Sequence, residues 1–199
     1  MRSEDWDAKF AASEFLFTDR PNQTLVAEVA ELPVGRALDL GAGQGRNAVW
    51  LAERGWQVTA VDFSPVGLER AETLAAAKGV KMSFVLADAR EWEPPVEAFE
   101  LALVAYLQLP ESELRAVLTG AAAAVAPGGT LLVVGHDRDN LTRGTGGPQD
   151  PDVLYTVDGV VTTLSGLRVD KAEQFARLVD TELGPMSAID TVVRGTKVS

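Results

Sequence analysis

The amino-acid sequence predicts an α/β fold with a mostly parallel sheet, and three observations support this prediction. Short runs such as those at 37–40 and 99–105 are almost entirely apolar, as strands buried on both faces of a parallel sheet are. Helical segments separate these runs, which is the strand–helix order of a parallel sheet. Two final segments, at 167–175 and 189–194, are expected to pair as an antiparallel hairpin that closes the sheet.

The expected elements make a doubly wound sheet of seven strands. Ser64 and Pro65 begin one of the helices as cap and first-turn residue, and Gly79 ends it. The expected strands are 37–40, 58–61, 81–86, 99–105, 130–135, 167–175 and 189–194. The expected helices are 4–11, 21–32, a helix directly after the turn at 41–45, then 65–78, 111–126 and 153–164, the last with a break at Asp158 and Gly159.

Length and composition limit the class of protein. A chain of 199 residues suits one domain, in which 1–33 would form a helical cover and 34–199 the core. There is no cysteine, so disulfides, thiolate metal sites and cysteine nucleophiles are excluded. The N-terminus has no apolar signal core and no run is long enough to span a bilayer. We therefore expect a soluble cytoplasmic protein without a membrane partner, either a monomer or a homodimer.

The net charge of −11 bears on the substrate. Proteins that bind nucleic acids normally carry a basic surface that neutralises phosphates. This sequence has no basic stripe. We expect a small-molecule substrate and no nucleic-acid partner.

The stretch 37–62 carries the most specific signal. Asp39 lies in the first strand, and Gly41, Gly43 and Gly45 follow it, so the backbone can turn sharply and approach a ligand. The helix after this turn presents unpaired N–H groups at its positive end. Asp62 stands at the carboxyl end of the next strand, where open α/β sheets bind ligands and where a carboxylate can accept both ribose hydroxyls of an adenosine.

Two adenosine cofactors fit that description. A nicotinamide dinucleotide site normally has a third glycine where Arg46 stands, so the loop departs from that pattern. Asp88, a second acidic residue at a strand end, also argues against a dinucleotide. Alternatively, Asp88 could cap a helix from Arg90 onward.

The residues Leu38-Asp39-Leu40-Gly41-Ala42-Gly43-Gln44-Gly45-Arg46-Asn47 resemble motif I of the class I S-adenosylmethionine (SAM) methyltransferases. The segment Val58-Thr59-Ala60-Val61-Asp62-Phe63-Ser64 resembles the acidic loop that follows it in this family. In detail the chain is similar to a small bacterial branch related to tellurite-resistance and thiopurine methyltransferases. The resemblance implies a Rossmann-like core that binds SAM.

The resemblance also implies residue roles. Asp88 would accept a hydrogen bond from the adenine amino group, and the backbone N–H of Ala89 would meet the ring. Phe10 and Phe17 would be inward-facing walls of an N-terminal segment that closes the pocket. The alternative is that this segment is a helix packed on the edge of the sheet. The expected cofactor-binding set is Asp39, Gly41, Ala42, Gly43, Asn47, Asp62, Phe63, Asp88, Ala89, Tyr106, Phe10 and Phe17.

Two residues are candidates for work on the methyl acceptor. Tyr106 follows the fourth strand and could face the sulfonium or be a core tyrosine with its hydroxyl at the rim. His136, the only histidine, follows the fifth strand and could be a general base, an orienting group or a structural residue. Asp137 and Asp139 begin a long loop, but exposed acidic loops are common and we expect no metal.

Three functions remain open at this stage. The first is a SAM-dependent methyltransferase that acts by in-line displacement on a sulfur, oxygen, nitrogen or chalcogen nucleophile of a small molecule. The second is an NAD(P)-dependent oxidoreductase, because Asp62 would serve any adenosine ribose. The third is a non-catalytic SAM-binding module.

Overall fold

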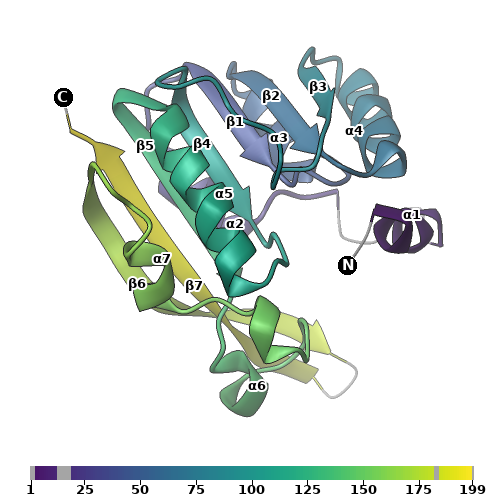
Figure 1. Ribbon diagram of the computed structural model, residues 1–199. Helices are drawn as coiled ribbons and strands as arrows, with labels where there is room; N and C mark the ends of the chain where they lie inside the picture. Colours follow the sequence, from purple (N-terminus) through teal and green to yellow (C-terminus); the bar gives the residue numbers. More distant parts are fainter. Residues whose placement is uncertain (1–2, 13–18, 182–183, 199) are drawn as a thin grey trace.

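The computed structural model describes residues 3–12, 19–181 and 184–198. Its seven-stranded sheet has the order β3-β2-β1-β4-β5-β7-β6 (Figure 1). Neighbours from β3 to β5 pair parallel, whereas β7 pairs antiparallel with β5 and with β6. The predicted mostly parallel sheet with a C-terminal hairpin is confirmed. The strands are β1 Arg36–Leu40, β2 Gln57–Asp62, β3 Ser83–Leu86, β4 Phe99–Ala105, β5 Val125–His136, β6 Leu167–Thr181 and β7 Gly184–Lys197.

Helices cover both faces of the sheet, which confirms the doubly wound arrangement. α5 and α7 lie on one face and α2 and α3 on the other (Figure 1), each pair packed into its own apolar cluster. The helices are α1 Ser3–Ala11, α2 Gln23–Val29, α3 Arg46–Glu53, α4 Pro65–Lys78, α5 Glu111–Ala124, α6 Asn140–Arg143 and α7 Val157–Val161, with a 3-10 turn η1 at Pro151–Val153.

Local sequence signals set the bounds of α4. The Ser64 side chain accepts a hydrogen bond from the N–H of Gly67, so it satisfies one of the unpaired donors of the first turn. Pro65 occupies that first turn. Gly79 ends the helix in the left-handed conformation with φ +69°. All three features match the prediction from the sequence.

The predicted helix at 153–164 is wrong in its extent and in the position of its break. Only Val157–Val161 is α-helical, and the chain is extended at Tyr155 rather than at Asp158 and Gly159. The N–H of Tyr155 donates to the carbonyl of His136 at 2.8 Å, and the Tyr155 carbonyl accepts from Arg138 at 2.8 Å. These hydrogen bonds to the end of β5 hold the segment in an extended form. Such long-range contacts cannot be deduced from a local helical sequence pattern.

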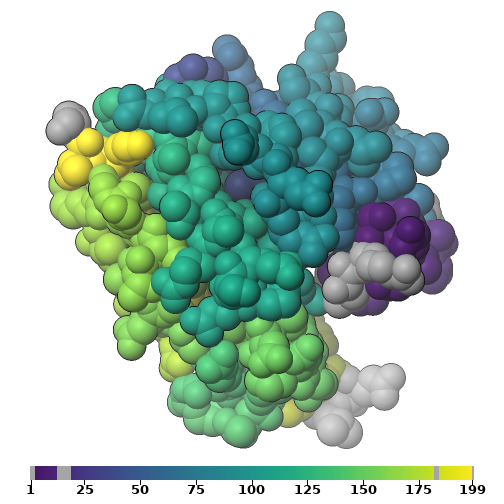
Figure 2. All heavy atoms as spheres, viewed as in Figure 1, coloured from purple at the N-terminus to yellow at the C-terminus, as the bar shows by residue number. Residues whose placement is uncertain are grey.

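The hairpin is longer than predicted and carries residues toward the carboxyl ends of the parallel strands. β6 is mostly exposed, whereas β7 is buried from Ala188 to Val193. α1 packs against α4 (Figure 2, purple against blue). Within the described residues, no helix has the length and apolar character needed to cross a membrane.

Candidate functional site

A cavity of about 810 Å³ opens at the carboxyl ends of the parallel strands, where the strand order reverses between β1 and β4. Open α/β sheets bind ligands at this position. Its wall comes from the loops after β1 to β5, from α1, and from the far end of the hairpin. The lining residues include Phe10, Asn22, Gly43, Arg46, Asp62, Asp88, Tyr106, His136, Gly147 and Arg177.

The glycine-rich loop after β1 forms the floor of the cavity. Gly41, Gly43 and Gly45 all have positive φ, at +76°, +54° and +78°. The N–H groups of Gly41 and Ala42 donate to the carbonyl of Val61 at 2.9 and 3.1 Å, so the loop is fastened to β2. A Cβ on Gly45 would lie 2.6 Å from the Cβ of its neighbour on α4, so helix and loop approach more closely than another residue allows.

Asp62 ends β2 on the cavity wall. Its carboxylate accepts hydrogen bonds from the N–H of Gly43 and from the N–H of Ser64, both at 2.8 Å. Burial raises the pKa of Asp62, and these N–H groups oppose that rise. The carboxylate is therefore held in one orientation beside the glycine loop.

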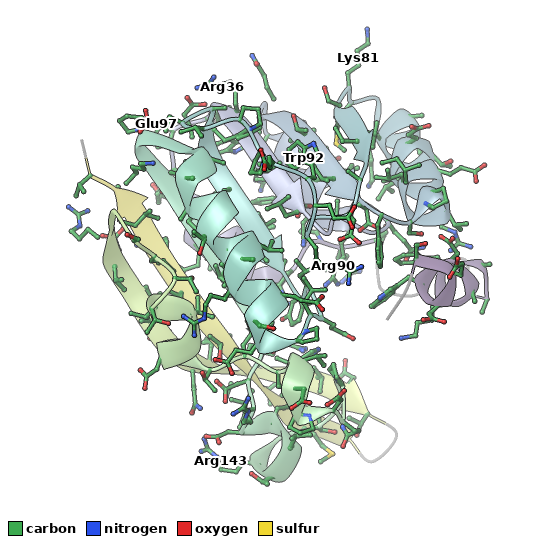
Figure 3. All side chains as sticks on the ribbon, viewed as in Figure 1. Arg36, Lys81, Arg90, Trp92, Glu97 and Arg143 are labelled. Carbon is green, nitrogen blue, oxygen red and sulfur yellow. The ribbon has the colours of Figure 1, made fainter. Side chains whose placement is uncertain are left out.

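Asp88 follows β3 and also lines the cavity. Its carboxylate is bound by the guanidinium of Arg90, with Nε 2.9 Å from Oδ1, and this hydrogen bond holds the pKa of Asp88 below its usual range. Arg90, which is labelled in Figure 3, also forms an ion pair with Glu113 of α5 at 3.1 Å. The Asp88 side chain accepts from the Arg90 N–H, but no helix follows. Asp88 is thus an anchored carboxylate at the rim rather than a helix cap.

Asp39 lies beneath the loop rather than on the cavity wall. It is 1% exposed, and the backbone N–H of Ala48 donates to it. Burial raises its pKa to about 7, and the nearby Asp62 charge adds to the rise. Its Oδ2 has no hydrogen-bond partner among the described residues. Asp39 positions the start of α3, so its predicted contact with a cofactor lacks geometric support.

A buried polar network forms the opposite end of the cavity. The Tyr106 hydroxyl donates to Oδ2 of Asp190 at 2.6 Å, and Nε of Arg177 donates to the same oxygen at 2.6 Å. The Tyr106 oxygen accepts from the Asn22 amide at 3.0 Å. The His136 ring packs against the Tyr106 ring at an angle of 56°, with ring centroids 4.8 Å apart. Tyr106 itself has φ +57°, a strained conformation for a non-glycine residue and one that is common at functional sites.

The cover predicted at the N-terminus is in part described. Trp6, Lys9 and Phe10 of α1 line the cavity. The Phe10 ring lies over the glycine loop, 3.3 Å from where a Cβ on Gly43 would stand. Phe17 lies outside the described residues.

The structure brings most of the predicted site residues to one cavity. They come from separate loops along the carboxyl edge of the sheet, as the position of their strands implied. Those that line the cavity are Phe10, Gly41, Ala42, Gly43, Asn47, Asp62, Phe63, Asp88, Ala89, Tyr106 and His136.

The polar network at the Tyr106 end contains residues that were not predicted from the sequence, among them Asn22, Arg177 and Asp190. Arg177 and Asp190 belong to the hairpin, where an alternating pattern gives no sign of which residues reach the cavity. Asn22 caps α2 by accepting from the N–H of Leu25 at 3.0 Å. The amide of Asn22 also donates to the Tyr106 hydroxyl oxygen, a contact between distant residues that the local sequence pattern does not reveal.

Comparison with known proteins gives a family match that covers part of the site. Residues 37–129 match the family model described as a methyltransferase domain. The matched region is similar to methyltransferase domains, and the comparisons support a SAM-dependent enzyme with SAM as its cofactor. The matched residues include the glycine loop, Asp62 and Asp88, which are the features that pointed to SAM.

Matches to individual proteins cover more residues than the match to the family model. The chain is 35% identical over 133 residues to a trans-aconitate 2-methyltransferase of Sinorhizobium medicae, which covers 63% of this chain and 47% of that protein. It is 33% identical over 113 residues to a tRNA 5-carboxymethoxyuridine methyltransferase of Escherichia coli, covering 53% and 42% of the two chains. The chain thus spans about half the length of the curated relatives it matches.

A solved structure described as "Conversion of a Disulfide Bond into a Thioacetal Group during Echinomycin Biosynthesis" shares the fold of the methyltransferase domain and its hairpin. Its TM-score is 0.77 at 23% identity, covering 98% of this chain and 92% of the other. At that identity the likeness concerns the fold alone.

The residues present fit SAM. The cavity volume of about 810 Å³ is in the range of cofactor and substrate sites, roughly 300–1,000 Å³. A fixed carboxylate, Asp62, and the open backbone at Gly43 lie at one end, as an adenosine requires. Tyr106 and His136 line the other end.

Proposed function

We propose that this chain transfers the methyl group of SAM to a small-molecule acceptor inside the cavity. The observation that supports this most is the continuity of the cavity. It runs from Asp62, suited to a ribose, to the network of Tyr106, His136 and Arg177. One ligand can therefore reach both ends, with a second molecule beside it.

Each end has its own task in this proposal. Asp62 accepts the ribose hydroxyls with the lone pairs that Gly43 and Ser64 leave open, because a carboxylate offers about four acceptor positions. Asp88 accepts the adenine amino group alongside Arg90, and the N–H of Ala89 meets the ring. The glycine loop lets the backbone approach the amino-acid part of the cofactor.

For methyl transfer, the main task of the protein is to position the acceptor relative to the methyl group. SAM supplies a methyl group already activated on a sulfonium. The chain must align an acceptor with it and exclude water, and such alignment is worth roughly 7–11 kcal/mol of the barrier. α1 supports the exclusion of water, since Trp6 and Phe10 lie over the cavity.

The charge of the chain supports a small acceptor. A net charge of −11 opposes the approach of a polyanion, and one related protein, the E. coli enzyme, is a tRNA methyltransferase while another is named for trans-aconitate. We propose the small-molecule class. The finer resemblance to the tellurite-resistance and thiopurine branch adds thiols, selenols and tellurium oxyanions to the acceptors worth testing.

Calorimetric titration tests the cofactor end. The chain is titrated with SAM, S-adenosylhomocysteine and NADH, and we expect binding of the first two only. Tight NADH binding without SAM binding would contradict the proposal in favour of an oxidoreductase.

Transfer of an isotopically labelled methyl group tests the activity. Phenols, enols, thiols, carboxylic acids, amines and total tRNA are offered as acceptors with labelled SAM. We expect label in at least one small molecule and none in tRNA. Label in tRNA alone would contradict the small-molecule class, and no transfer despite SAM binding would favour a non-catalytic module.

A further inference from the structure

His136 and Asp190 face each other across two antiparallel strands. They are direct partners in the register of β5 and β7, so their side chains lie on the same face of the sheet. Nδ1 of His136 lies 3.4 Å from Oδ1 of Asp190. The pair is therefore placed by the sheet itself, which is more rigid than a loop.

The two oxygens of Asp190 have different neighbours. Oδ2 accepts from the Tyr106 hydroxyl and from Nε of Arg177, whereas Oδ1 makes no hydrogen bond of normal geometry among the described residues and has Nδ1 of His136 3.4 Å away. Asp190 is fully buried. Burial alone would raise its pKa, but the neighbouring His136 and Tyr106 side chains and the Arg177 charge hold the pKa of Asp190 below its usual range. The carboxylate is therefore charged and fixed.

The imidazole ring has one free edge, and that edge faces the cavity. Nδ1 is fully buried, yet the His136 side chain keeps 15% of its surface exposed and lines the cavity. Tyr106 lies against one part of the ring, and a Cβ on Gly147 would come within 3.0 Å of it. Because Nδ1 is buried and the rest of the ring lines the cavity, we infer that Nε2 lies on the side that faces the cavity.

We propose that His136 is the proton acceptor of this methyltransferase site, that Asp190 positions it, and that the natural acceptor carries a hydroxyl protonated at neutral pH, of the phenol or enol class. The proposal rests on the proposed function. A thiolate or a carboxylate reaches the site ionised and needs no base, so a buried His–Asp pair at the acceptor end has a use only for a protonated nucleophile.

The acceptor oxygen forms a bond to the methyl carbon while its O–H proton passes to Nε2 of His136. The carbon–sulfur bond breaks, and its electron pair stays on sulfur, which loses its positive charge. The imidazolium that results is stabilised by the Asp190 carboxylate until the proton leaves to solvent.

Tyr106 serves the pair rather than the acceptor. Its hydroxyl donates to Asp190, and burial raises the pKa of Tyr106 far above neutrality. A phenol that is both protonated and committed to Asp190 cannot accept a proton. We therefore assign Tyr106 to positioning and to the wall of the cavity.

Nitrogen NMR of the imidazole tests the pair without any substrate. His136 is the only histidine in the sequence, so the untagged chain labelled with ¹⁵N-histidine gives one imidazole. At a pH where the ring is neutral we expect the proton on Nδ1 and none on Nε2. A ring that carries its proton on Nε2 would overturn the assignment even before any variant is made.

Two variants extend this measurement. Asp190→Asn removes the carboxylate, so the proton should redistribute toward Nε2. Asp170→Asn is the control, because Asp170 is a hairpin carboxylate that binds Arg168 and Thr196 away from the cavity. An unchanged imidazole spectrum in Asp190→Asn would contradict the pairing.

Kinetics separate this proposal from the proposed function. With a phenol acceptor, Asp190→Asn should lower kcat about 100-fold, the lower end of general-base effects, with KM for SAM unchanged. With an acidic thiol that is ionised at the assay pH, kcat should change less than about 3-fold by the same reasoning. Equal losses for both acceptors would contradict the base while leaving methyl transfer intact. If the unmodified chain turned over neither acceptor nor any other in the panel, the proposed function itself would fail.

Discussion

The substitution Asp62→Ala tests the adenosine end of the cavity. It removes the carboxylate that Gly43 and Ser64 hold at 2.8 Å. A hydrogen bond to a charged group is worth about 1.5–3 kcal/mol, so loss of the ribose contact should raise the Kd of S-adenosylhomocysteine roughly 10- to 160-fold.

Isothermal titration calorimetry with S-adenosylhomocysteine measures this change, since that ligand binds without reacting. Asp62→Asn is a second variant that keeps the side-chain shape but loses the charge. Glu100→Ala is the matched control. Its carboxylate also accepts a backbone N–H, from Arg36 at 2.7 Å, but at the opposite edge of the sheet. Affinity that is unchanged in both Asp62 variants, or reduced equally in Glu100→Ala, would refute the ribose assignment.

Two further predictions concern stability. Burial raises the pKa of Asp39 to about 7 from 3.8, so its ionisation is disfavoured in the folded state and the free energy of unfolding should fall as pH rises from about 4 to about 7. In Asp39→Asn, the free energy of unfolding should fall by a few kcal/mol less between these two pH values, as measured by urea denaturation at each. An identical pH dependence in the variant would show that Asp39 does not titrate in this range. Gly45→Ala should lower the free energy of unfolding by about 1–3 kcal/mol, because its Cβ would lie 2.6 Å from Ala71 Cβ. Gly79→Ala is the control, because Gly79 also has a positive φ but an added Cβ there would meet nothing within 4 Å. Thermal melts in which both variants lose the same stability would show that the clash with α4 does not matter.

The cofactor end could be predicted from the sequence because its signals are local. The glycine turn, Asp62 and Asp88 each follow a recognisable strand, and parallel strands bring their carboxyl ends to one edge. The predicted bounds of α4 succeeded for the same reason, since Ser64 and Gly79 act within a single turn.

The acceptor end could not be predicted in the same way. Asp190 reaches His136 only through the register of β5 and β7, and Arg177 through the register of β6 and β7. An alternating strand pattern does not fix such a register. The helix expected at 153–164 failed for a related reason, because hydrogen bonds from β5 hold Tyr155 extended. Asp39 was predicted to bind the cofactor because a sequence motif does not show that a side chain is buried beneath a loop.

A crystal structure with S-adenosylhomocysteine tests the central claim most directly. We predict that both ribose hydroxyls lie within hydrogen-bond distance of the Asp62 carboxylate and that the sulfur lies at the end of the cavity nearer to Tyr106 and His136. A ribose away from Asp62, or a sulfur at the Asp88 end, would contradict this account of the site.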